Sequence, residues 1–203
     1  MDHEQLAKTL TAVKAYAEEH HVPIMENQGI RELTDLLLQQ QPESILEIGS
    51  AIGFSAIMMA SELAGCQIDT IERDDVRYEK AVEFIAQSGL GGQIRIFHAD
   101  ALEMDLSLLD REYDAIFIDA AKGQYERFFE KYETLLSEQG SIYCDNMYMH
   151  GLADQEISEI PRRKRTMIRN LKNFKEHMLN HPSYDTALLP VGDGIMVCKK
   201  RAN

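Results

Sequence analysis

The 203-residue sequence has no tryptophan, only three cysteines and five prolines, and no long apolar run. Cys66, Cys144 and Cys198 are odd in number, far apart and set in or beside apolar runs, which argues against a disulfide framework or a zinc site. We therefore expect three buried thiols. The missing apolar run argues against a membrane-spanning helix, and the first residues lack the basic-then-apolar order of a secretion signal. We expect a cytoplasmic protein with no membrane partner.

Positive charge is also scarce, because 21 Lys and Arg face 34 Asp and Glu, a formal net charge of -13. This balance argues against a generally basic nucleic-acid binder. The cations are unevenly spread, however, and seven of them lie between residues 162 and 175 without an acid: Arg162, Arg163, Lys164, Arg165, Arg169, Lys172 and Lys175. A solvated helix face is the ordinary interpretation of such a run, and a local contact with phosphates is the alternative.

The length fits one domain over residues 1–203, with two helices in 1–41 and a core in 42–203. Apolar residues recur at helical spacing over 6–20 and 30–40, after which short apolar runs alternate with helical stretches. The expected strands are 44–48, 67–71, 93–97, 113–119 and 141–145, and the expected helices between them are 55–63, 76–88 and 125–136. This rhythm predicts an α/β fold with a mostly parallel sheet and helices on both faces.

The end of the chain breaks this rhythm. A long helix is expected over 162–179, and two strands follow at 184–190 and 194–200 with only a short turn between them. Such strands pair as a hairpin, so we predict seven strands in total, the last two forming an antiparallel pair at the sheet edge.

Glycines and acids follow the expected strands. The first strand runs into Gly49 and Gly53, which permit a tight turn and a close backbone approach to a ligand, and Ser55 is placed to start or cap the next helix. Glu47 lies beside these glycines, while Glu72 and Asp100 end the second and third strands. An acid about twenty residues after such glycines is placed to accept hydrogen bonds from ribose hydroxyls. A plain structural turn remains an equal alternative for the glycines alone.

A second polar set follows the fourth and fifth strands. Asp119 is followed three residues later by Lys122, and Asp145 is followed directly by Asn146. Carboxylate and amide oxygens suit Mg²⁺ or Ca²⁺ and are poor ligands for Zn²⁺. For any one of these residues a cap or a solvated charge is the simpler interpretation, but the complete set beside the glycine turn favours a metal site.

Together these motifs resemble the class I methyltransferases, and within them the cation-dependent O-methyltransferases of the catechol and caffeoyl-coenzyme A type. The resemblance rests on E-I-G-x-x-x-G-x-S at 47–55, the acids ending the next two strands, D-A-x-K at 119–122, D-N at 145–146 and P-V-G-D-G at 190–194. It extends from the segment HHVPIME to the C-terminus and implies a Rossmann-like fold. The missing G-x-G-x-x-G leaves an NAD enzyme as a weak alternative.

The resemblance implies roles for individual residues. S-adenosylmethionine would be held by Met25, Glu47, Gly49, Ser55, Glu72, Asp100, Ala101 and Asp119. Mg²⁺, or Mn²⁺ or Ca²⁺ in its place, would be held by Asp119, Asp145 and Asn146, with Lys122 as the general base. By analogy we also expect a homodimer, whose contact surfaces would be the two N-terminal helices and the edge hairpin.

The segments AYAEEHHVPIME, FIDAAKGQY, NHPSY and LLPVGDG further resemble the bacterial tRNA 5-hydroxyuridine methyltransferases of this family. That resemblance implies the wobble base of a tRNA anticodon loop as the methyl acceptor. The basic run follows the loop after Asp145 and Asn146, so its candidate contacts with the tRNA are Arg162, Arg163, Lys164, Arg165 and Arg169. Two alternatives stay open: an O-methyltransferase of small catechol or caffeoyl compounds, and a non-catalytic binding module of the same fold.

Overall fold

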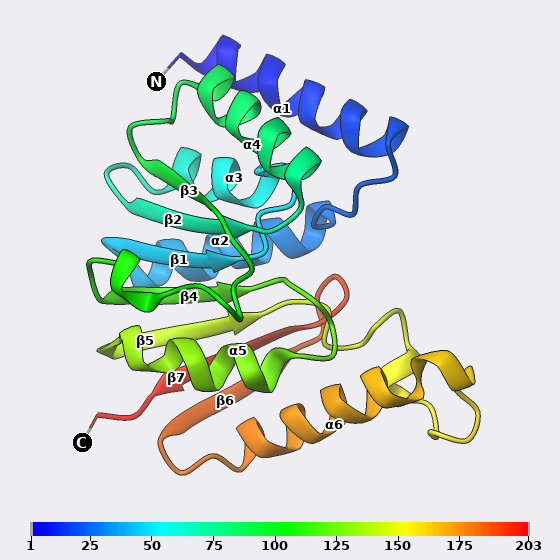
Figure 1. The fold of residues 1–203 in the computed structure, drawn as a ribbon. Helices are drawn as coiled ribbons and strands as arrows, with labels where there is room; N and C mark the ends of the chain where they lie inside the picture. The colour runs from blue at the N-terminus through cyan, green and yellow to red at the C-terminus, as the bar shows by residue number, and fades with distance from the viewer. Residues whose placement is uncertain (1, 203) are drawn as a thin grey trace.

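The computed structural model describes residues 2–202, in which strands and helices alternate as the sequence predicts (Figure 1). The strands are β1 Ser44–Ile48, β2 Gln67–Glu72, β3 Ile94–His98, β4 Tyr113–Ile118, β5 Leu136–Cys144, β6 Tyr184–Leu189 and β7 Ile195–Lys200. The α-helices are α1 His3–Glu19, α2 Asn27–Gln40, α3 Phe54–Glu62, α4 Asp75–Ser88, α5 Tyr125–Tyr132 and α6 Arg165–Leu179.

All seven strands form one sheet in the order β3-β2-β1-β4-β5-β7-β6. The pairs from β3 to β5 are parallel, whereas β7 runs antiparallel to β5 and pairs with β6 as an antiparallel hairpin at the edge. The predicted sheet and edge hairpin are confirmed. The direction of strand order reverses between β1 and β4, and ligands of such sheets bind beyond the strand ends at that point.

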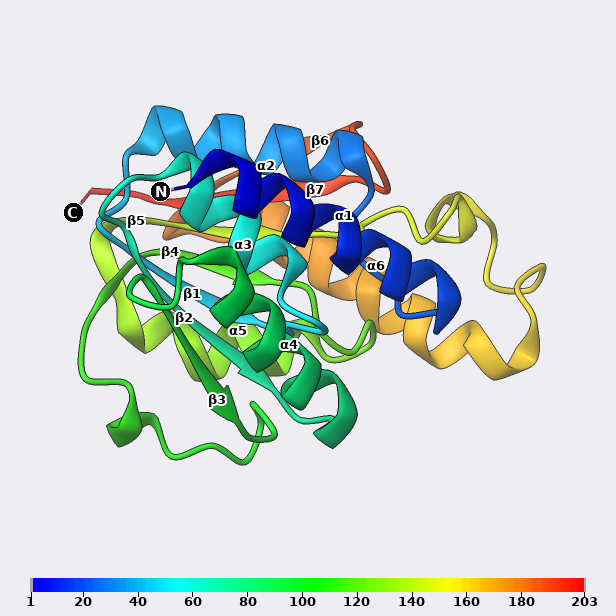
Figure 2. The ribbon, with the colours of Figure 1, turned by 90° about the horizontal axis from the view of Figure 1, so that it is seen from above.

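Helices cover both faces of the sheet, as predicted (Figures 1 and 2). One apolar core joins α5 and α6 to strand residues such as Leu46 and Ile116, and the other joins α1 to α4 to their neighbours Ile45 and Ala115. Successive strand residues therefore enter opposite cores, as the pleat of a strand requires. Helix α1 packs on α4, in the outer layer of its side.

Three local predictions were wrong. β5 begins at Leu136 instead of residue 141, and α5 ends at Tyr132, because the polar stretch after Leu136 conceals a strand that pairs with β4 through a register shift. The predicted helix at 162–179 opens with a 3-10 turn at Arg162–Lys164 before α6. Ser55 does not cap α3: the cap is Gly53, whose φ of 86° suits a residue without a side chain.

The cysteines behave as predicted, since all three are buried free thiols. Across residues 2–202, no helix is both long and apolar enough to cross a membrane.

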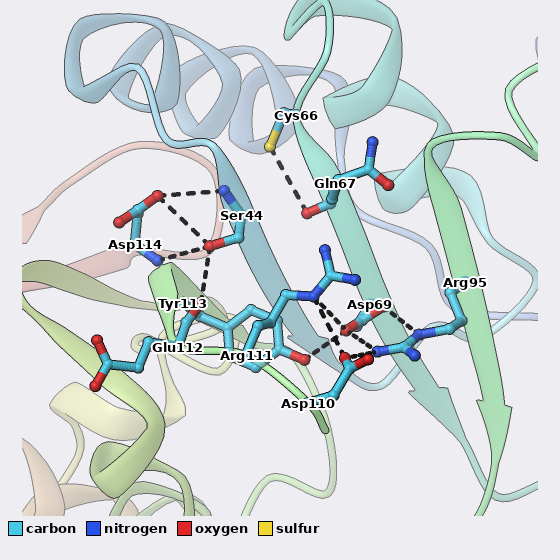
Figure 3. A network of polar contacts seen from close by, with 10 residues as sticks. All are labelled: Ser44, Cys66, Gln67, Asp69, Arg95, Asp110, Arg111, Glu112, Tyr113 and Asp114. Carbon is cyan, nitrogen blue, oxygen red and sulfur yellow. Dashed lines mark hydrogen bonds and ion pairs between the residues drawn. The ribbon is translucent and has the colours of Figure 1, made fainter. Parts of the chain in front are cut away.

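A polar network lies where the parallel strands begin, away from their carboxyl ends (Figure 3). Asp69 of β2 is almost fully buried and binds both the Nε and Nη2 atoms of Arg95 at 2.8 Å. The hydroxyl of Tyr113 also donates to this carboxylate, and Arg111 lies 3.7 Å from it. The buried charge is thus balanced by its own protein partners, so we assign this network to stability.

Glu47 ties together three elements near the opposite end of the sheet. Its side chain is fully buried within β1 and accepts hydrogen bonds from the Ser55 hydroxyl of α3 and from the Thr70 hydroxyl of β2. Burial raises the pKa of Glu47 to about 7, against the lowering effect of these two hydrogen bonds. The carboxyl group is therefore largely protonated in the folded protein at mildly acidic pH.

Substitution of Asp69 tests the network at the start of the strands. Asp69→Ala leaves the Tyr113 hydroxyl and the Arg95 guanidinium without their acceptor, so we expect the free energy of unfolding to fall by about 3 kcal/mol. Urea denaturation measures this loss. The exposed pair of Asp185 and Arg201 offers the control, since Asp185→Ala should cost less than about 1 kcal/mol. Equal losses would contradict the assigned role.

The Glu47 carboxyl predicts a dependence of stability on pH. Its pKa is higher in the folded chain than the 4.5 of an ordinary glutamate side chain, so the folded state holds the proton more tightly. The stabilisation is complete below pH 4.5 and is lost as the pH rises to about 7, by about 3 kcal/mol for this group. Urea denaturation at several pH values should show this slope in the wild type and its removal in Glu47→Gln. An identical pH dependence of both proteins would contradict the burial argument.

Candidate active site

A cavity of about 390 Å³ lies at the carboxyl ends of the parallel strands. Its wall contains most of the predicted site residues, from both the glycine side and the metal side: Met25, Gly49, Ser55, Glu72, Asp100, Ala101, Asp119, Lys122, Asp145 and Asn146. Glu47 does not line this cavity and lies behind Ser55, which its carboxyl group holds. The structure thus brings the two predicted halves of the site into one space.

The turn after β1 approaches the end of β4 very closely. The backbone N–H groups of Gly49 and Ser50 both donate to the carbonyl of Ile71 at 3.1 Å. Gly49 has a φ of 99°, and a Cβ atom placed on it would lie 2.5 Å from the carbonyl oxygen of Asp119. Any side chain at position 49 would push the glycine turn away from Asp119, so glycine is required here for two separate reasons.

The carboxylate of Glu72 organises the same turn. One of its oxygens accepts the Ala51 N–H at 2.8 Å, and the other accepts the N–H groups of Arg73 and Asp74 at 2.9 and 2.8 Å. Asp100 accepts the Leu102 N–H at 2.9 Å and lies 3.4 Å from the guanidinium of Arg73. Both acids therefore have fixed positions on the cavity wall at the ends of β2 and β3.

Two further wall residues suit a polar, partly apolar ligand. The hydroxyl of Ser50 is buried and has no hydrogen-bond partner within residues 2–202, so a bound molecule could supply one. Met25 lies in the link between α1 and α2, is buried, and reaches the cavity from the side of α2. The glycine half of the cavity thus combines backbone N–H groups, acids, a free hydroxyl and a thioether.

The other half contains the half-buried carboxylate of Asp119 and the buried carboxylate of Asp145, with the Asn146 amide between them. The Asn146 amide nitrogen lies 2.8 Å from Asp119 Oδ1 and 3.2 Å from Asp145 Oδ2, and Lys122 Nζ donates to Asn146 Oδ1 at 2.5 Å. Tyr125 fixes this end of β5, because its hydroxyl donates to the Asp145 carbonyl at 2.7 Å. These contacts place all four predicted residues of the metal side in one cluster.

The electrostatics of this cluster favour a bound cation. Burial raises the pKa of Asp119 well above its ordinary value, and the negative charge of Asp145 raises it further. Burial likewise raises the pKa of Asp145. A divalent cation between the two groups would remove the cost of ionising both. A half-turn of the Asn146 amide would point its oxygen at the same place, so these residues fit an oxygen-ligated ion such as Mg²⁺.

The site depends on the amide as well as on the carboxylates. Within residues 2–202 no group of three or more His, Cys, Asp or Glu side chains is arranged to hold a metal. Two carboxylates with one amide leave positions free for water and for an acceptor molecule, as Mg²⁺ sites commonly do. Zn²⁺ is disfavoured, because the donor set has neither a thiolate nor an imidazole.

Sequence reasoning missed several residues of this wall, among them the polar residues Ser50, Arg73, Arg77, His150 and Asp193. Asp193 was noticed only as part of the turn P-V-G-D-G, without a role. No periodicity marks these residues, since each belongs to a loop or a helix start that reaches the cavity only in the folded chain.

The run of cations at residues 162–175, called here the basic segment, lies beside the cavity without lining it. Asn170 of α6 donates to the Gly123 carbonyl at 3.1 Å, and Met167 packs against Gly123, which follows Lys122 directly. The first residues of α6 lie on the side toward which β1 to β5 point (Figure 1). The start of α6 is therefore attached to the turn that carries Lys122.

The predicted contact residues of this segment divide into two groups. Arg165 binds the carbonyls of Ser158 and Ile160 at 2.7 and 2.8 Å, so its guanidinium holds the preceding loop. The other four make no side-chain hydrogen bond or ion pair within the described residues: Arg162, Arg163, Lys164 and Arg169. These four are the cations of the segment that remain available to a partner.

Comparison with known proteins places the chain in a family. The model of the O-methyltransferase family matches residues 2–201. Tapetum-specific methyltransferase 1 of Arabidopsis thaliana is 28% identical over 206 residues, which cover 98% of this chain and 87% of that protein.

Solved structures agree with this match. The crystal structure of a candidate caffeoyl-CoA O-methyltransferase from Staphylococcus aureus is 33% identical, has a TM-score of 0.88, and covers 95% of this chain and 92% of that one. The O-methyltransferase of Bacillus cereus in complex with SAH is 24% identical with a TM-score of 0.81, covering 96% and 91% of the two chains, and shares the fold. The chain belongs to the O-methyltransferase family.

Proposed function

We propose that this protein transfers a methyl group from S-adenosylmethionine to a hydroxyl group, with Mg²⁺ at Asp119, Asp145 and Asn146. One observation carries this proposal: Lys122 and these three residues form a hydrogen-bonded cluster on the wall of one cavity, and the glycine turn forms the other half of that wall. Family membership supports the reaction class, and the SAH in the Bacillus cereus relative supports the cofactor.

The cofactor would occupy the glycine half of the cavity. Glu72 and Asp100 are placed to accept hydrogen bonds from its ribose and base, with Ala101 beside them, and Ser50 and the turn at Gly49 face its amino-acid end. When bound, S-adenosylmethionine supplies an activated methyl group and Mg²⁺ eases ionisation of the acceptor hydroxyl. The chain's own residues position the reactants and exclude water.

Lys122 is the proposed general base. Its Nζ atom lies at the metal-side cluster, 2.5 Å from Asn146 Oδ1, and it lines the cavity itself. The half-turn of the Asn146 amide that would present its oxygen to a cation would release Lys122 from this contact. An amine at this point can take the proton of an acceptor hydroxyl that enters between the cluster and the cofactor. Asp119, next to the glycine turn, lies where the two halves meet, so it would orient both the acceptor and the cofactor.

The proposed acceptor is 5-hydroxyuridine at the wobble position of tRNA, which would become 5-methoxyuridine. Its 5-hydroxyl and neighbouring C4 carbonyl oxygen offer two adjacent oxygens, as a catechol does. The free cations of the basic segment support this choice, because they lie next to the turn of Lys122 on an otherwise acidic chain. A base in an anticodon loop can enter a cavity without the melting of a duplex.

A small catechol or caffeoyl compound is the second candidate. The similarity to the Staphylococcus aureus protein favours it, and a cavity of about 390 Å³ would accept a single aromatic ring beside the cofactor. The two acceptors share the same chemistry at the reacting oxygen. They differ in whether phosphates outside the cavity contribute to binding.

Replacement of Lys122 tests the proposed chemistry. We expect Lys122→Ala to lower kcat about 100-fold or more, because the acceptor hydroxyl loses its proton acceptor, while the Kd for SAH changes less than about threefold. A radiolabelled methyl-transfer assay and calorimetric titration with SAH measure the two quantities. Lys199→Ala, at an exposed position of β7, is the matched control with unchanged kcat. Full activity of the Lys122 variant would refute its role as base.

Charge reversal on the basic segment tests the acceptor. The variant Arg162→Glu, Arg163→Glu and Arg169→Glu should lose at least about tenfold in kcat/KM toward tRNA at moderate salt, because three phosphate contacts become repulsive. Methylation of a small catechol, if the enzyme accepts one, should change less than about twofold, since none of the three residues lines the cavity.

Cells provide the decisive readout for this prediction. Mass analysis of tRNA nucleosides from cells lacking the protein should show 5-hydroxyuridine in place of 5-methoxyuridine, with restoration by the wild type and not by the reversed variant. The control reverses Lys8, Lys199 and Arg201, exposed cations away from the cavity, and should restore the modification. An unchanged nucleoside profile on loss of the protein would refute the tRNA assignment.

A further inference from the structure

The turn between β6 and β7 closes one side of the cavity and is held firmly in place. The Met147 N–H donates to the Gly194 carbonyl at 3.0 Å, and the Tyr148 N–H donates to the Asp193 carbonyl at 2.8 Å. Gly192 lies so close to the start of α2 that a Cβ on it would be 3.2 Å from the Cα of Gly29. The turn therefore joins the loop that follows Asn146 to the opposite wall.

The carboxylate of Asp193 uses only one of its two oxygens within the chain. Oδ1 accepts the His150 backbone N–H at 2.6 Å and lies 3.8 Å from the His150 ring nitrogen Nδ1. Oδ2 is buried and has no hydrogen-bond partner within residues 2–202, and the side chain as a whole is only 8% exposed. Native proteins rarely leave such an oxygen unpaired, because a carboxylate without water or a donor costs free energy.

The position of Asp193 points to the acceptor and not to the cofactor. It lines the same cavity as Lys122 and Asp145, and it is attached to the loop that begins at Asn146. The residues proposed for the ribose and base of the cofactor lie at the other end of the cavity, where Glu72 ends β2 and Asp100 follows β3.

Resting on the proposed function, we propose that Asp193 is the residue that recognises the uracil ring, its Oδ2 accepting a hydrogen bond from the ring N3–H. In 5-hydroxyuracil the N3–H adjoins the C4 carbonyl, which itself adjoins the reacting 5-hydroxyl. A carboxylate accepts hydrogen bonds and donates none, so it matches this N–H. A catechol carries a C–H at the corresponding ring position and would leave Oδ2 unpaired, which makes Asp193 a specificity-determining residue.

Two anticodon stem-loop RNAs test this assignment. One carries 5-hydroxyuridine at the wobble position, and the other carries 3-methyl-5-hydroxyuridine, which lacks only the N3–H donor. For the wild type, kcat/KM should fall at least about tenfold with the methylated base. Calorimetric titration of both RNAs into the SAH-bound protein provides a second readout, in which the Kd should rise by a similar factor.

Two variants test whether Asp193 is the partner of the N3–H group of the uracil ring. Asp193→Ala removes both oxygens, while Asp193→Asn keeps an oxygen for the His150 N–H and turns an amide nitrogen toward the cavity. Both variants should bind 5-hydroxyuridine RNA more weakly, and the ratio between the two RNAs should fall to about one. Asp185→Asn, an exposed carboxylate on the same hairpin, is the matched control and should keep the wild-type ratio.

The outcomes separate the two levels of the proposal. If Asp193 only supports the loop, its variants weaken both RNAs equally and the wild-type ratio persists, which overturns the assignment while leaving the proposed function intact. A wild type that methylates both RNAs equally well also overturns it. Absence of transfer to the 5-hydroxyuridine RNA refutes the proposed function and this assignment together.

Discussion

The site depends on the close approach of two backbones, the turn after β1 and the end of β4. Gly49 lies against the carbonyl of Asp119 with no room for a Cβ atom, and the Asp119 N–H donates to the Ile48 carbonyl at 3.0 Å. The end of β5 is attached to β4 in the same way, since the Asp145 N–H donates to the Ile118 carbonyl at 3.2 Å. Parallel pairing thus places the cofactor side and the metal side in contact, and any displacement of one moves the other.

Several carboxylates are buried or half-buried in or beside the sheet, and the fold compensates their charge in three different ways. Glu47 is kept neutral by burial over much of the pH range and serves as a hydrogen-bond partner inside the sheet. Asp69 is neutralised by arginine at the far end of the strands. Asp119 and Asp145 form no ion pair with an arginine or a lysine within residues 2–202, and they are the carboxylates that we propose for the metal ion. Buried carboxylates that are neutralised by protein partners, such as Asp69, stabilise the fold, whereas those without such partners are the candidates for binding a ligand.

Much of the fold was predictable, because each inner strand is a short apolar run and each covering helix has its own spacing. Asp119 and Asp145 could be found as well, since each directly follows such a run and parallel strands end at one edge. Glu47 is an exception: its motif implies a contact with the cofactor, yet its side chain is buried inside β1 and accepts a hydrogen bond from Thr70 of β2. Asp193 had no signal of its own, because its role arises from hydrogen bonds between loops far apart in the sequence.

The charge distribution narrows how a large anionic acceptor could approach. A net charge of -13 repels a polyanion over most of the surface, and the effect fades within about 8 Å at physiological salt. Arg162, Arg163 and Arg169 are the exceptions, and the attachment of α6 to Gly123 places them beside the turn of Lys122. Repulsion by the acidic remainder of the surface would then help to orient the acceptor, together with its attraction to the basic segment. Such a surface favours a large anionic acceptor over a small one without reading its base, so discrimination between bases has to come from groups inside the cavity.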